Sequence, residues 1–110
     1  MAISNLLTPE SNETFKNEIA VIRKQALKFS TKGIIANIKG MKIRTEKKEL
    51  LKNYQKRKTL LIGKNDPILN WKTAVSIAEY CNCKTILTTG GHLAYIENTA
   101  EVREILRFID

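Results

Sequence analysis

The chain contains little cysteine and no long hydrophobic run. Its two cysteines, Cys81 and Cys83, are one residue apart, so they supply at most half of a zinc site, and we interpret them as structural thiols of a reducing compartment. No apolar run approaches the roughly 20 residues that cross a bilayer. The segment 1–7 lacks the basic start and the long apolar stretch of a signal peptide. These absences predict a cytoplasmic protein that needs neither a membrane nor a metal or other cofactor.

Acidic and aromatic residues are also scarce. The chain has 19 Lys and Arg against 11 Asp and Glu, a net charge of +8, and only 6% aromatic residues. Much of the positive charge lies in one stretch, at Lys42, Arg44, Lys47, Lys48, Lys52, Lys56, Arg57 and Lys58. Such a stretch can bind nucleic acid or another anion. Because Tyr54 is its only aromatic residue, we favour a solvated helix and loop, and nucleic acid is not the expected partner.

The remaining composition fits one globular domain, since 110 residues with 43% apolar residues can form a core. The first half reads as helical. Thr8 and Pro9 form an N-cap and a first helical position, Ser30 caps a second helix that Gly40 ends, and Thr45 begins a third. The apolar stripe of the first helix has helical spacing at Ile19, Ile22, Ala26 and Phe29.

The second half changes character near Lys58. Two short apolar runs, 58–63 and 84–89, read as strands, and Asn70 caps a helix between them. A strand–helix–strand unit of this kind places its two strands in parallel. A last helix follows, with a capping box at Asn98 and Glu101 and an apolar stripe at Val102, Ile105, Leu106 and Ile109.

An acid and a base follow the two predicted strands. Asp66 comes after the first strand, and His92, the chain's only histidine, comes after the second, 26 positions later. The carboxyl ends of parallel strands lie on one edge of the sheet, so we expect the Asp66 carboxylate within hydrogen-bonding reach of the His92 ring. A carboxylate beside an imidazole is two thirds of a charge-relay triad, which lacks only the nucleophile.

Three segments of the sequence resemble the α/β-hydrolase family. The segment 60–69 resembles the strand and loop that deliver the acid of the triad, and 90–98 resembles the loop that delivers its histidine. The segment 40–45 resembles the connection between cap and core in esterase-like members. The resemblance covers the chain from about Leu6 to Asp110 and agrees with the family's order of acid before histidine. It implies an α/β fold in which 1–57 is a helical, cap-derived region and 58–110 is the C-terminal strand–helix–strand–helix of the core.

The nucleophile of that family is missing from the chain. A nucleophile elbow has the pattern Gly-x-Ser-x-Gly, and none of the four serines, Ser4, Ser11, Ser30 and Ser76, is flanked by glycine. We therefore expect the C-terminal part of a hydrolase that acts on a small-molecule ester or related bond. Asp66 and His92 are its catalytic residues, and a Ser, Asp or Cys nucleophile lies elsewhere. Alone, the chain is expected to be inactive.

Three points stay open at the level of sequence. Two apolar parallel strands are not a stable sheet by themselves, so we expect further strands from the missing N-terminal half or from a partner chain. Glu97 could be an alternative acid, but its position favours an interaction with the dipole of the last helix. The competing hypothesis is a small, non-catalytic basic module that binds nucleic acid or an acidic partner through 42–58.

Overall fold

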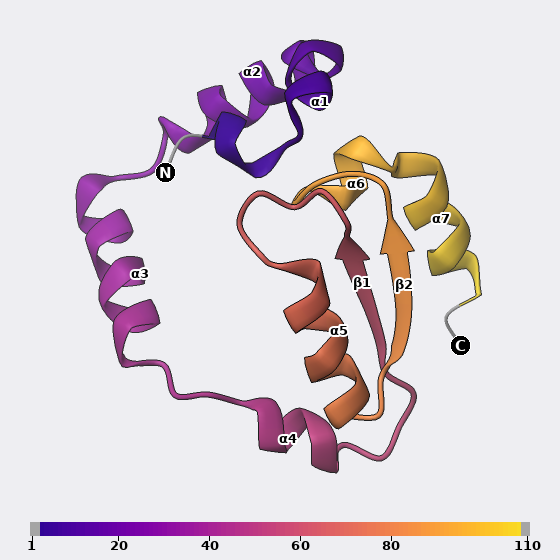
Figure 1. Ribbon diagram of the computed structural model, residues 1–110. Helices are drawn as coiled ribbons and strands as arrows, with labels where there is room; N and C mark the ends of the chain where they lie inside the picture. The colour runs from indigo at the N-terminus through magenta and orange to yellow at the C-terminus, as the bar shows by residue number, and fades with distance from the viewer. Residues whose placement is uncertain (1–2, 109–110) are drawn as a thin grey trace.

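The protein is a mixed α/β structure, shown in Figure 1 as a computed structural model that describes residues 3–108. Its elements, in chain order, are η1 (Ile3–Leu6), α1 (Pro9–Thr14), α2 (Lys16–Ala26), α3 (Thr31–Ile43), α4 (Lys48–Asn53), β1 (Thr59–Gly63), α5 (Trp71–Tyr80), β2 (Lys84–Thr88), α6 (Ala94–Glu97) and α7 (Thr99–Arg107).

The predicted strand–helix–strand unit is confirmed. β1 and β2 pair in parallel, in a register that runs from Thr59 opposite Lys84 to Gly63 opposite Thr88. The intervening α5 begins at the predicted cap, because Asn70 Oδ1 accepts hydrogen bonds from the first backbone N–H groups of the helix. α5 then packs back along both strands (Figure 1). Both strand ends therefore reach the same edge of the sheet.

The two strands are less buried than their apolar sequences predict. At the carboxyl end, Ile62, Gly63 and Thr88 are buried, but Leu87 is 40% exposed. The physical reason is that β1 and β2 are the only strands in the described part of the chain, so each has a free edge. The sheet is thus covered well only near its carboxyl edge.

The first helical region follows its predicted caps but not its predicted lengths. Thr8 Oγ1 accepts a hydrogen bond from the Ser11 N–H, and Pro9 opens α1 as expected. The helix expected to continue from Pro9 is interrupted at Phe15, which separates α1 from α2, and α2 carries Ile19 and Ile22 of the predicted stripe and ends at Ala26. Phe29 lies beyond it and is 69% exposed.

The prediction that Gly40 ends the second helix is wrong. Ser30 caps α3 as predicted, but the helix passes through Gly40 and ends at Ile43. A single glycine inside a helix costs only about 1 kcal/mol relative to alanine, and the flanking residues are good helix formers. The third helix, α4, begins at Lys48 and not at Thr45.

A short helix, α6, precedes the predicted last helix, α7, and the predicted capping box is wrong. Asn98 precedes α7 but makes no side-chain cap, because its Oδ1 accepts a hydrogen bond from the Gly90 N–H instead. The Asn98 amide donates to Glu101, at 3.0 Å. Ile109, the end of the expected stripe, lies outside the described residues.

The main apolar cluster joins the start of the chain to its end. Leu7, Ile19 and Ile96 are buried together, and Leu6 and Leu93 pack against them. This cluster lies at the carboxyl edge of the sheet, beside the loop that carries His92 (Figure 1). None of the helices between residues 3 and 108 is both long and apolar enough to cross a membrane.

Candidate functional site

Asp66 lies in the loop that follows β1, and its carboxylate organises that loop. Asp66 Oδ1 accepts hydrogen bonds from the backbone N–H groups of Ile68, at 2.7 Å, and of Leu69, at 3.1 Å. An aspartate that bonds to the backbone two and three residues later forms a local turn, for which the following Pro67 is well suited. One carboxylate oxygen is thereby fixed, and the other is left for a different partner.

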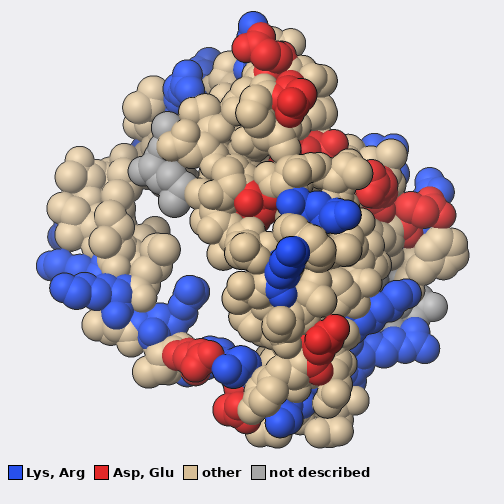
Figure 2. All heavy atoms as spheres, viewed as in Figure 1, with Lys and Arg blue, Asp and Glu red and all other residues tan. Residues whose placement is uncertain are grey.

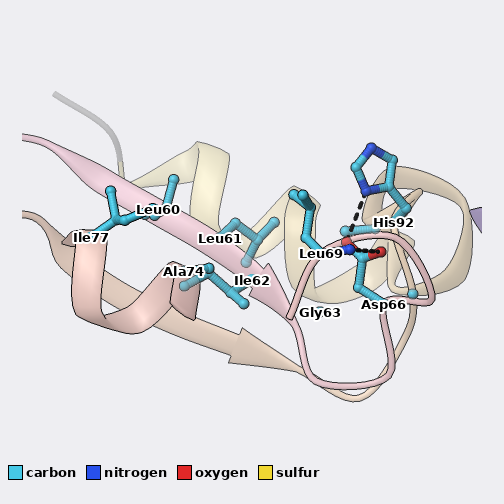
Figure 3. A pocket seen from close by; sticks show the side chains of 11 residues that line it. Leu60, Leu61, Ile62, Gly63, Asp66, Leu69, Ala74, Ile77 and His92 are labelled. Atoms are coloured by element: carbon cyan, nitrogen blue, oxygen red, sulfur yellow. Dashed lines mark hydrogen bonds and ion pairs between the residues drawn. The ribbon is translucent and has the colours of Figure 1, made fainter. Parts of the chain in front are cut away.

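That partner is His92. The His92 Nδ1 lies 2.8 Å from Asp66 Oδ2, which confirms the predicted contact between the two residues (Figure 3). The Asp66 side chain is only 7% exposed, whereas that of His92 is 35% exposed. The pair therefore has a sheltered acid and an imidazole that reaches the surface.

This contact decides where the proton of a neutral His92 resides. An ionised carboxylate can only accept hydrogen bonds, so Nδ1 must carry the hydrogen that faces Asp66. The lone pair of the neutral ring then lies on Nε2. Within residues 3–108, Nε2 has no hydrogen-bond partner, so it is free to take a proton from another group.

The surroundings of Asp66 keep its carboxylate ionised. Burial alone would raise the pKa of Asp66, but the hydrogen bonds from His92, Ile68 and Leu69, together with the charge of a protonated His92, outweigh it and lower the pKa below its usual range. An ionised Asp66 accepts the hydrogen bond of Nδ1 and holds the imidazole in one orientation.

Three hydrogen bonds tie the Asp66 loop to the His92 loop. The N–H of Lys64 donates to the carbonyl of Thr88, at 2.9 Å, and the N–H of Asn65 donates to that of Gly90, at 3.1 Å. The Asn65 side chain also donates to the Thr89 carbonyl, at 2.7 Å. Lys64 and Asn65 thus hold the loop of the acid against the loop of the base.

Gly63 allows the two loops to come this close. A Cβ atom at this position would collide with the backbone carbonyl oxygens of Gly90 and Gly91. The requirement is for space and not for an unusual backbone angle, since Gly63 does not have a positive φ. A side chain here would therefore push the His92 loop away from Asp66.

The His92 loop is also held from its other side. The N–H of Gly90 donates to Asn98, at 3.1 Å, that of Gly91 to Glu97, at 2.8 Å, and that of His92 to the Leu6 carbonyl, at 2.8 Å. Glu97 closes α6 and lies two positions before the start of α7, near the beginning of the last helix as expected, and its carboxylate also holds the His92 loop. The bare N–H groups of a Gly-Gly pair near an acidic residue could have indicated this role.

An apolar groove runs from the free edge of β1 to the acid–histidine pair. It has a volume of about 270 Å³ and is lined by four consecutive β1 residues, 60–63, by Leu69, Ala74 and Ile77, and by Asp66 and His92 (Figure 3). Because consecutive residues of a strand point to opposite faces, a groove that touches all four follows the edge of the strand. The groove thus adjoins the part of β1 that has no strand neighbour.

The basic stretch 42–58 is partly engaged in internal contacts. The Lys58 ammonium donates to the carbonyls of Leu51 and Lys52, at the end of α4, and to that of Cys81. The ammonium groups of Lys48 and Lys52 lie over the ring of Tyr80, at 5.1 and 4.0 Å from its centre. Figure 2 shows the basic side chains spread over several parts of this face, including α3 and the segment that leads into α4.

The cysteines lie where the helix passes into the second strand. Cys81 is fully buried at the end of α5, Cys83 is half-buried, and both are free thiols. Between residues 3 and 108, no three His, Cys, Asp or Glu side chains come together in a way that could hold a metal ion.

Comparison with known proteins gives no relative from which a role could be transferred. No family model matches the chain, and neither the curated proteins nor the solved structures contain a significant match.

Proposed function

We propose that this chain supplies the acid and the base of an α/β-hydrolase that cleaves an ester or a related bond in a small molecule. The observation that carries the proposal is the 2.8 Å contact between His92 Nδ1 and Asp66 Oδ2 at the carboxyl edge of two parallel strands. The resemblance of 60–69 and 90–98 to the acid and histidine segments of that family agrees with this geometry.

In this function, His92 is the general base. Its Nε2 takes the proton of the nucleophile as the nucleophile attacks the substrate carbonyl, returns it to the leaving group, and then activates the water that completes hydrolysis. Asp66 keeps Nδ1 protonated and stabilises the imidazolium that forms in each step. A carboxylate nucleophile in place of a hydroxyl or thiol would use His92 mainly in the water step.

The nucleophile comes from outside these 110 residues, together with the strands that complete the sheet. The free edge of β1 and the apolar groove along it support this arrangement, because an edge strand with apolar, half-exposed side chains is suited to pair with another strand. We place the missing part of the sheet against this edge, where its loops would adjoin His92.

The test is a reconstitution. The DNA upstream of the Met1 codon is translated in frame, and an extension that contains a Gly-x-nucleophile-x-Gly elbow is joined to this chain. We expect the joined protein to hydrolyse p-nitrophenyl butyrate and the present chain alone not to do so. His92→Ala and Asp66→Ala should each lower kcat by about 10⁴-fold or more.

Two results would contradict the proposal. One is a ribosome-binding signal directly before Met1 with no coding extension upstream. The other is a joined, folded protein whose esterase activity does not depend on His92. A matched control is Glu104→Gln, which changes an exposed carboxylate on α7 that pairs with Arg107, and it should leave the activity unchanged.

A further inference from the structure

Two segments that lie far apart in the sequence meet on one carboxylate. Glu97 Oε2 accepts the hydrogen bond of the Gly91 N–H, at 2.8 Å, and Glu97 Oε1 accepts that of the Thr8 N–H, at 3.0 Å. The adjacent Leu6 carbonyl accepts a hydrogen bond from the N–H of His92 itself, at 2.8 Å. The residues just before and after Leu7 are therefore connected to the residue that carries the imidazole and to its neighbour.

The chemistry of this junction requires a carboxylate. Two backbone N–H groups from different segments each need an acceptor, and a carboxylate offers two acceptor oxygens. A glutamine offers one oxygen and would direct its NH₂ group at the other N–H, which repels it. An aspartate has both oxygens but is one methylene shorter and cannot reach both donors in the same way.

From this junction, and resting on the proposed function, we propose that Glu97 is a positioning residue for His92. It does not touch the reacting atoms. It fixes the backbone of Gly91 against the start of the chain. The His92 backbone is therefore held in one position relative to the sheet, and Nδ1 stays within hydrogen-bonding distance of Asp66. The buried cluster of Leu7 and Ile96 places the two segments in contact, and Glu97 determines their register.

The test uses the imidazole nitrogens of His92 in the ¹⁵N-labelled 110-residue chain. His92 is the only histidine, so its signals need no further assignment. Above the pH at which His92 titrates, the parent chain should show the tautomer with hydrogen on Nδ1 and a slowly exchanging Nδ1 proton. Asp66→Asn should abolish both signatures. Glu97→Gln should lower the population of this tautomer and make the Nδ1 proton exchange about fivefold faster, as expected for one lost hydrogen bond.

The control is Glu104→Gln, which removes an exposed carboxylate from the neighbouring α7 and should leave both signatures as in the parent. If Glu97→Gln does not fold, as judged by circular dichroism, Glu97→Asp keeps the charge and is expected to give the same change to a smaller degree. A folded Glu97→Gln chain with parental His92 signatures would overturn the proposal, and so would the failure of both variants to fold.

These readouts involve neither substrate nor nucleophile. A joined protein without esterase activity would therefore contradict the proposed function and leave the role of Glu97 intact. Unchanged His92 signals in Glu97→Gln would overturn the role of Glu97 alone.

Discussion

The segments 58–108 and 27–57 differ in how far their apolar side chains are buried. In 58–108, the apolar residues of β1 and α5 face one another, and Ile62 and Ala78 are buried between them. In 27–57, the apolar side chains face outward. They are Leu27, Phe29, Ile34, Ile35, Ile38, Met41, Ile43, Leu50, Leu51 and Tyr54, all between 37% and 81% exposed.

This difference indicates which part of the protein is packed around the candidate site. The segment 58–108 contains Asp66, His92 and the hydrogen bonds that join their two loops. α3 carries apolar side chains of the kind that pack in a core, but none of its residues is buried. A face of this kind is suited to packing against another surface, as the free edge of β1 is.

The largest expected effect on stability comes from removing a buried side chain of the segment 58–108. Ile62→Ala should lower the free energy of unfolding by about 3 kcal/mol, because Ile62 is 6% exposed and its loss leaves a cavity under the site. Ile38→Ala, in α3, removes the same atoms from a side chain that is 59% exposed. It should change the free energy of unfolding by less than about 0.5 kcal/mol. Chemical denaturation of both variants measures the contrast, and equal losses would refute it.

A pair of glycines gives the next largest effect, with opposite signs in the two regions. Gly63→Ala should destabilise the chain by about 2 kcal/mol, since its Cβ would meet the carbonyl oxygens of Gly90 and Gly91. Gly40→Ala, inside α3, meets no atom within 4 Å and should stabilise it by about 1 kcal/mol. Thermal unfolding detects both signs, and a neutral Gly63→Ala would show that the two loops can separate without cost.

The sequence predicts the strand–helix–strand region better than the helices before it, for physical reasons. The sequence has local signals that agree with one another, namely the cap Asn70 and the two apolar runs. Together they predict a parallel pair of strands, and the contact of Asp66 with His92 follows from that geometry. The passage of α3 through Gly40 depends on small propensity differences that the pattern does not decide. The hydrogen-bond partners of Glu97 could not be predicted, because one of them, the Thr8 N–H, is brought to it by the packing of Leu7 on Ile96.

The ionised state of Asp66 gives an effect that depends on pH. Because the folded state lowers the pKa of Asp66, the stabilisation that this carboxylate provides is present above its unfolded value, near 3.8, and is lost as the pH falls through the folded value. The stability of the parent chain should therefore approach that of Asp66→Asn as the pH is lowered below about 4. Denaturation at several pH values measures this difference, in which the other carboxylates cancel. A constant difference between the two chains would show that Asp66 is not preferentially ionised in the folded state.

The smallest effect separates two lysines of the basic stretch. Lys58→Met should lower the free energy of unfolding by about 1 kcal/mol, because it removes hydrogen bonds to the carbonyls of Leu51, Lys52 and Cys81. Lys56→Met should change the free energy of unfolding by no more than about 0.5 kcal/mol.

The same two variants test the alternative of a basic binding module, in which both lysines would contribute to a salt-dependent affinity for nucleic acid. If Lys58 is a structural cap, its loss should appear in denaturation and not in the retention of the chain on immobilised DNA at low salt. Equal weakening of DNA binding by both variants, with unchanged stability, would instead favour the binding module.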